Sequence, residues 1–361
     1  DRTEAIPVVE DTRNLEYDVT LAIKKAISQA KPIVGYVTSN STLKPDSEIT
    51  VAYKKLQEMY DVREINLSAE EAPADLKTLI IAGPKEKFEE KALKEIDKFL
   101  MRGGSLLVLA DGVKVGNGLS ASKNDTGLDT LLEKYGVKLS HNLVLDASSG
   151  IASFNQGFVT FSTNYPFWPK IISAGFDKEN VSVAKLESVI MPWASSLDIL
   201  TDKIAQNNKI FYLIKTTKNS WTQEENYNLN PQQMYSGAQN TGAKTLAVSI
   251  FGKFQSAYGD GSTDSGRLIV AGDSDFVADG FARQAPDNII LFQNLVDSLS
   301  LDEDLISIRS KGISERPIKQ KEEGEKSLIR YSNIFGLTLV VIAFGLIRYF
   351  LRRRTRFEDE L

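Results

Sequence analysis

Three aspartates in one short segment are the side chains best suited to chemistry. Asp273, Asp275 and Asp279 lie in the stretch GDSDFVADG, directly after the apolar run RLIVA. Carboxylates at the carboxyl end of a strand can bind Mg²⁺ or transfer protons. Short Asp and Ser side chains in this position are also typical helix caps, which accept hydrogen bonds from free N–H groups of the next helix. We favour capping and keep the alternative of a divergent hydrolase that uses Asp273, Asp275 and Asp111.

Two further strand ends belong to the same predicted crevice. Gly83 and Pro84 follow the buried run TLIIA, and Asp111 follows SLLVLA. Open α/β sheets bind ligands in the crevice at the carboxyl ends of their strands. We therefore expect any small polar ligand to contact Gly83, Asp111, Asp273 and Asp275. The absence of a nucleophile or base beside them argues against turnover.

The composition excludes several kinds of site. The 361 residues include no cysteine, so disulfides, thiolate metal sites and a cysteine nucleophile are ruled out. His141 is the single histidine, at the start of a predicted strand, and favours a structural role. The motifs G-x-S-x-G, H-E-x-x-H and G-x-x-x-x-G-K-[ST] are absent, and the net charge of −5 argues against nucleic acid as a partner. We expect no catalytic residue, metal or cofactor.

Helical and strand patterns alternate through the first part of the chain. The runs PIVGYV, TLIIAG and SLLVLADG are apolar throughout and are separated by amphipathic helices at 47–60 and 85–102. Such strands are typical of parallel sheets covered by helices on both faces. The pattern predicts a doubly wound, mostly parallel α/β sheet over 31–150, including the strand HNLVLD. Residues 266–310 return to this sheet.

The middle of the chain predicts a different organisation. Residues 151–265 are rich in aromatic, Asn and Ser residues, with strand-like runs such as KIFYLIK and TLAVSIF. We predict a β-rich, loop-rich insertion. Trp221 lies in a polar, turn-rich segment at 218–245, which we interpret as a surface loop. Its ring could stack on a glycan or pack in the core, and both interpretations stay open.

A C-terminal run without charge, YSNIFGLTLVVIAFGLI, occupies 331–347. A membrane-crossing helix needs about 20 mostly apolar residues, so we predict a transmembrane helix over 328–351. Flanking basic residues favour a cytoplasmic tail at 352–361 and an extracytoplasmic body in the inner cell membrane. A charged tether would occupy 311–327, and 1–30 would be the remnant of a preceding domain with a connecting helix. The residues expected at the membrane flanks are Arg330, Arg348, Arg352, Arg353 and Arg354.

Several segments together resemble a known family. They are RTEAIPVVEDTRNLEYDVTLAIKKAI, KPIVGYVTSN, FLMRGGSLLVLADG, GRLIVAGDSDFVAD and NIILFQNLVDSLSLDEDLISIRSK. This pattern resembles the auxiliary, substrate-binding-like subunit of bacterial ABC transporters of the gliding-motility-associated type. The resemblance implies a permease and an ATPase as partners, an N-terminal transmembrane helix and domain before the LEYD block, and a non-catalytic sheet related to glutamine amidotransferases. In those enzymes a cysteine follows the strand that TLIIAG matches, whereas here Gly83-Pro84 stands there.

The sequence thus supports two main functional hypotheses. The first is a non-enzymatic accessory subunit that is anchored in the membrane and docks on an ABC permease. The second is a membrane-tethered sensor that binds a glycan, an envelope polymer or a small ligand.

Overall fold

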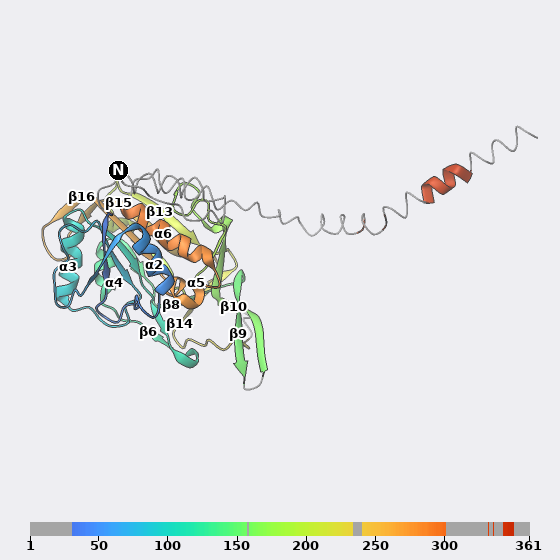
Figure 1. The fold of residues 1–361 in the computed structure, drawn as a ribbon, viewed down its shortest axis with the longest axis horizontal. Helices are drawn as coiled ribbons and strands as arrows, with labels where there is room; N and C mark the ends of the chain where they lie inside the picture. Colours follow the sequence, from blue (N-terminus) through green and yellow to red (C-terminus); the bar gives the residue numbers. More distant parts are fainter. Residues whose placement is uncertain are drawn as a thin grey trace, which may run out of the picture. The chain divides into compact units, whose positions relative to one another are not determined.

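The computed structural model describes residues 31–156, 159–233, 240–300, 331, 335 and 342–349. Residues 31–300 lie in one compact unit, and the described residues from 331 onward lie in a second unit. The first unit is built around a seven-stranded sheet with the strand order β13-β15-β16-β4-β3-β1-β2 (Figure 1). Five neighbouring strands are parallel: β1 (Ile33–Val37), β2 (Asp61–Ile65), β3 (Thr78–Ala82), β4 (Ser105–Leu109) and β16 (Ser262–Ala271).

Helices cover both faces of this sheet, which explains why its central strands are apolar throughout. In β3, Ile80 and Ala82 join one core cluster, whereas Leu79 and Ile81 join the other. Successive strand side chains point to opposite faces, so a strand between two helical layers buries every residue. The first face packs against α2 (Thr50–Met59), α5 (Asp279–Ala282) and α6 (Pro286–Ser300). The second packs against α3 (Glu90–Met101) and α4 (Leu128–Lys134).

The fold class differs from the predicted doubly wound, mostly parallel sheet with a separate β-rich insertion. Two strands of the predicted insertion, β13 (Lys209–Lys215) and β15 (Thr245–Gln255), extend the main sheet in antiparallel orientation. The fold is therefore a mixed α/β arrangement with several sheets. Sequence pattern marked these runs as strands but carries no information on which edge they join.

Four small sheets surround the main one. They comprise β9 (Ser149–Gln156), β10 (Val159–Ile172) and β11 (Ser188–Ile190); β7 (Val137–Leu139) with β12 (Leu197–Ile199); β8 (Asn142–Asp146) with β14 (Ser220–Glu224); and β5 (Val113–Val115) with β6 (Ala121–Lys123). The strand HNLVLD, predicted in the main sheet, is β8 and pairs with β14 instead. Trp221, predicted in a loop, lies in β14 opposite Leu145.

Short helical turns connect some of these strands. They are the 3₁₀ turns η2 (Asn117–Leu119), η3 (Ser173–Gly175), η4 (Thr201–Lys203) and η5 (Asp275–Val277). η2 lies at the tip of the β5–β6 hairpin, and η5 follows β16 directly. The tripeptide Gly116-Asn117-Gly118 therefore lies in the turn of this hairpin.

The predicted C-terminal transmembrane helix is not seen. Within 328–351 the structure describes residues 331, 335 and 342–349, and 342–349 are helical with Arg348 exposed. Across the described part of the chain, no helix combines the length and apolar composition needed to cross a membrane. The fold-class prediction is wrong on this point, because a span needs about 20 helical residues and the described helical stretch there covers 342–349. The other predictions for this end and for the N-terminus lie outside the described residues: 1–30, 311–327, 352–361, Arg330, Arg352, Arg353 and Arg354.

Candidate functional site

The carboxyl ends of three neighbouring parallel strands bring the predicted ligand residues together. Gly83 follows β3, Asp111 follows β4 after Ala110, and Asp273 follows β16 after Gly272. The strands lie in the order β16-β4-β3, in register, so their ends reach the same edge. Asp275 enters from η5, two residues beyond Asp273.

Asp111, Asp273 and Asp275 form an acidic cluster at this edge. Each offers a carboxylate oxygen, and these oxygens all lie within 4.8 Å of one another. Asp111 accepts two hydrogen bonds from Ser274, from the backbone N–H at 2.7 Å and from Oγ at 2.6 Å. Asp273 is fully buried; its Oδ1 accepts the Asp275 N–H at 2.7 Å, while its Oδ2 is buried with no hydrogen-bond partner.

Burial and mutual repulsion make it costly to ionise all three carboxyls. Burial, followed by repulsion from Asp111, raises the pKa of Asp275 to about 8. Burial also raises the pKa of Asp273 well above its usual range, and the charges of Asp275 and Asp111 add to the effect. The pKa of Asp111 is raised by burial in spite of its bonds from Ser274. The cluster therefore stores unfavourable electrostatic energy that a proton or a cation would relieve.

Gly83 holds the strand ends close rather than offering a ligand. Its φ is +61°, in the left-handed region, and a Cβ there would lie 2.6 Å from Ser274 Oγ and 2.8 Å from Leu43 Cγ. Any side chain at this position would push away Ser274, the residue that bonds Asp111. Gly83 is not among the residues that line the cleft described below, and its role in ligand contact stays a prediction.

An open cleft with a volume of about 740 Å³ lies over the cluster. Asp111 and Asp275 contribute to its lining from the strand ends, and Lys85 does so from the segment after β3. The β5–β6 hairpin and Trp193 supply other parts of the lining. Two members of the acidic cluster are therefore accessible from solvent, whereas Asp273 lies behind them with no exposed surface.

His141 and Asn124 support the loops of the site. The ring of His141 lies between the Gly112 carbonyl, 2.8 Å from Nδ1, and Asp129 Oδ2, 3.0 Å from Nε2. Asn124 is buried and donates from Nδ2 to the carbonyls of Pro84 and Asp111, each at 3.0 Å. These bonds tie the ends of β3 and β4 together, so the structural interpretation of His141 fits its contacts.

Comparison with known proteins identifies the family. A family model described as an ABC-type uncharacterized transport system matches residues 31–299, which is most of the chain and the whole of the α/β body. The chain belongs to this family. It is thus an auxiliary component of an ABC-type transport system, and such systems in general include a permease and an ATPase. The resemblance found in the sequence is confirmed at this level.

Two relatives extend the comparison. An uncharacterized protein of Borreliella burgdorferi is 27% identical over 367 residues, covering 98% of this chain and 72% of that protein. Among solved structures, the mmIFT52 N-terminal domain is similar with a TM-score of 0.50 and 15% identity, covering 75% of this chain and 98% of that domain. At this identity the second likeness concerns the fold alone.

One of the three aspartates, Asp279, does cap a helix, but it caps α2 rather than the helix that follows it. Asp279 accepts hydrogen bonds from Thr50 Oγ1 at 2.5 Å and from Val51 N–H at 3.0 Å, at the start of α2. Burial alone would raise the pKa of Asp279, but these bonds hold it below its usual value. The cap residues of η5 and α5 make no side-chain cap bond, but Asp273 accepts the N–H of Asp275, the first residue of η5.

Trp221 is a predicted ligand residue that does not line the cleft. Trp221 is partly buried against a third apolar cluster and is not among the residues lining the cleft, so its glycan-binding role stays a prediction. Sequence reasoning missed Lys85 and Ser274, and it favoured a core position for Trp193. The first two could have been found by applying the strand-end rule to the residues next to those chosen. Trp193 reaches the cleft from a distant segment, and no local signal indicates it.

Proposed function

We propose that this auxiliary component is a non-enzymatic accessory subunit that docks on the permease of its ABC transporter, of the gliding-motility-associated, substrate-binding-like type. The observation that carries the proposal is the family match over 31–299, because it covers the complete α/β body. Docking on a permease would place the body at the cell membrane, with its bulk on the extracytoplasmic side as the sequence predicts.

Two candidate acid–base groups at the strand ends, Asp111 and His141, are already engaged by protein contacts. General acid–base work needs a group that can reach a substrate proton at the operating pH. Asp111 is engaged by Ser274 through both carboxylate oxygens, and both ring nitrogens of His141 face protein acceptors. The serines lining the cleft, Ser120 and Ser122, have no histidine beside them among the described lining residues.

The β9–β10 hairpin is the proposed docking element. It projects from the body at the end opposite α3 (Figure 1). Ile151 on β9 is 64% exposed, an unusual position for a large apolar side chain on a strand. Docking would cover it, and burying a side chain of this size contributes roughly 1.5–3 kcal/mol.

Purification from native membranes tests the assignment. The full chain carrying an affinity tag should retain an ATPase and a multispan permease in gentle detergent. Ile151→Asp should abolish this retention, whereas Tyr212→Asp, which changes another exposed large side chain on β13, should not. A tagged wild-type chain that elutes alone and monomeric would refute the proposal. Equal retention by both variants would refute the assignment of the hairpin.

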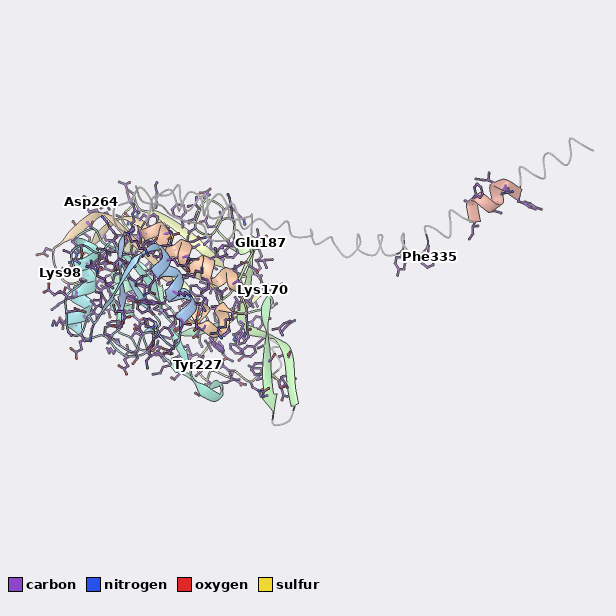
Figure 2. The ribbon with its side chains drawn as sticks, viewed as in Figure 1. Lys98, Lys170, Glu187, Tyr227, Asp264 and Phe335 are labelled. Carbon is purple, nitrogen blue, oxygen red and sulfur yellow. The ribbon has the colours of Figure 1, made fainter. Side chains whose placement is uncertain are left out.

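Site-specific photo-crosslinking maps the contact independently. Lys170 on β10 and Lys98 on α3 lie toward opposite ends of the body in Figure 2. A photo-crosslinking amino acid at position 170 should capture the permease, and one at position 98 should not. Protease treatment of spheroplasts compared with inverted vesicles reports the side of the membrane. Degradation of the body only in inverted vesicles would place it in the cytoplasm and contradict the proposed location.

A further inference from the structure

We propose that Asp111, Asp273 and Asp275 form a binding site for a divalent cation, with Ca²⁺ as the ion that fits best. The site lies below the strand-end cleft and replaces the expectation from sequence that the chain binds no metal. It goes beyond the docking role and does not depend on it, because its ligands belong to this chain alone.

The ligand set indicates a hard cation. All three candidate ligands are carboxylates, and the described part of the cluster includes no nitrogen or sulfur ligand. Oxygen-only sites suit Ca²⁺ and Mg²⁺ rather than transition metals. Ligands on opposite sides of an ion are separated by twice the bond length, about 4.6–5.2 Å for Ca²⁺ and about 4.0–4.2 Å for Mg²⁺. An upper limit of 4.8 Å on the separations of the three oxygens admits either ion. Three carboxylates favour Ca²⁺, because Mg²⁺ keeps several waters and is usually bound by one or two carboxylates.

A second observation, independent of the clustering, points to a ligand. Asp273 has no exposed surface, and its Oδ2 has no hydrogen-bond partner. A buried carboxylate oxygen without a hydrogen bond costs roughly 1–3 kcal/mol, because it has lost its water. Burial outweighs the backbone N–H groups of Asp275 and Phe276 that act on this carboxyl. The other oxygen of the same carboxylate accepts the Asp275 N–H, so the group is held in place with one oxygen available. A cation bound by all three residues would give that oxygen its partner.

The cleft gives an ion a path from solvent and leaves room for its remaining ligands. Asp111 and Asp275 line it, so an ion from solvent reaches two ligands before it meets Asp273. Ca²⁺ takes about 6–8 oxygen ligands. Three carboxylates leave positions for water, or for an oxygen-bearing group of a molecule in the cleft.

The charges around the site also favour a cation. Lys85 is the lysine whose charge acts on Asp111 and Asp275, and its Nζ lies 3.6 Å from Glu48 Oε1. Its charge is therefore shared with another carboxylate and does not neutralise the cluster alone. Protons are the competing way to relieve the repulsion, and the experiment separates the two.

Calorimetric titration of the full chain is the direct test. The protein is treated with EDTA, dialysed, and titrated with CaCl₂ and with MgCl₂ at neutral pH. We expect one Ca²⁺ per chain, bound more tightly than Mg²⁺, with Asp275→Asn weakening the affinity at least about tenfold. Asp198→Asn, a matched change on β12 at a second cleft, should leave the affinity unchanged. Absence of binding to the wild-type chain, or equal binding by Asp275→Asn, would overturn the proposal and leave protonation as the explanation.

Terbium luminescence gives a readout that does not depend on heat. Tb³⁺ substitutes for Ca²⁺ and emits when a nearby tryptophan is excited, and Trp193 lines the same cleft. The wild-type chain should show sensitised emission that Ca²⁺ displaces. Trp193→Phe should weaken the emission, with Trp168, whose ring lies 5.7 Å from that of Trp193, as a second donor, and should keep calorimetric Ca²⁺ binding. Asp273→Asn should lose both, and if it does not fold, the partly exposed Asp275 decides the outcome. Emission that persists in Asp275→Asn would place the ion elsewhere and refute the site.

Discussion

Replacing Asp297 with asparagine should remove a pH dependence from the stability of the fold. Asp297 lies on α6 and is buried, with 1% of its surface exposed. Its Oδ1 accepts a hydrogen bond of 2.5 Å from the Tyr60 hydroxyl. Burial raises the pKa of this carboxyl to about 7, although the bond from Tyr60 acts in the opposite direction. Near neutral pH the native protein therefore carries a proton that the unfolded chain has lost.

The magnitude follows from linkage. The interval between the ordinary value of 3.8 and about 7 corresponds to about 4 kcal/mol, at about 1.4 kcal/mol per pH unit. Because the folded pKa is raised, this stabilisation is complete below the unfolded pKa and is lost as the pH rises through about 7. Lowering the pH from 8 to 6 should therefore raise the free energy of unfolding by about 1.4 kcal/mol through this group. Asparagine keeps the acceptor for Tyr60 and cannot titrate.

Urea unfolding of wild type and Asp297→Asn at pH 6 and at pH 8 measures the effect. The quantity to compare is the difference between the two proteins at each pH, because contributions from all other groups cancel in it. As the pH falls from 8 to 6, the free energy of unfolding of wild type should rise by about 1.4 kcal/mol relative to that of Asp297→Asn. A difference that stays constant, or that changes in the opposite direction, would show that burial of Asp297 does not raise its pKa.

Three further predictions concern stability. Gly83→Ala should cost about 1–2 kcal/mol or more in urea unfolding, since a left-handed φ disfavours a side chain and the new Cβ would meet Ser274. Asp97→Asn should lower the free energy of unfolding by roughly 1–3 kcal/mol in thermal melts, because its carboxylate accepts bonds from Tyr135, Ser256 and Ala257. Asp279→Ala should lower the free energy of unfolding by about 1 kcal/mol at pH 7, because it removes the cap of α2. The difference from wild type should shrink below about pH 4, because the pKa of this carboxyl is lowered in the folded state and its protonation at low pH removes the stabilisation.

Sequence pattern predicted an element correctly where a single run of residues determines that element. The apolar runs became β1, β3 and β4, and the amphipathic stripe that includes Ile96 and Phe99 became α3. These predictions succeed because burial on two faces or on one stripe leaves a local trace in the sequence. The partners of β8 and β14 leave no such trace. Asp146 shows why, since it is buried and accepts bonds from Thr217 N–H and Oγ1, a contact between segments 71 residues apart.

The candidate site was predicted in part for the same reason. The strand-end rule predicts that Asp111, Asp273 and Asp275 share one edge of the sheet, and the structure brings all three together. Pattern could not show that Asp273 Oδ2 lacks a hydrogen-bond partner or that Asp279 crosses to α2, because both depend on the packing of distant segments. The apolar run at 331–347 shows where composition alone led to a wrong prediction. Its composition predicted a membrane helix, whereas no helix among the described residues has the length and apolar composition to cross a membrane.

One distant residue explains how the acidic cluster acquires its spacing. Ser195 donates its N–H to the Gly272 carbonyl at 2.6 Å, and its Oγ accepts the Gly112 N–H at 3.0 Å. It therefore bridges the ends of β16 and β4, the strands that carry Asp273 and Asp111. Both glycines are required by this approach, since a Cβ on Gly272 would lie 2.1 Å from the Ser195 carbonyl oxygen and one on Gly112 would lie 2.8 Å from its Oγ. The same short segment carries Trp193, so the wall of the cleft and the separation of the carboxylates are fixed by one piece of chain. Three carboxyl groups can be held this close because the contacts around them fix the strand ends, which is why the site depends on packing that its own residues do not reveal.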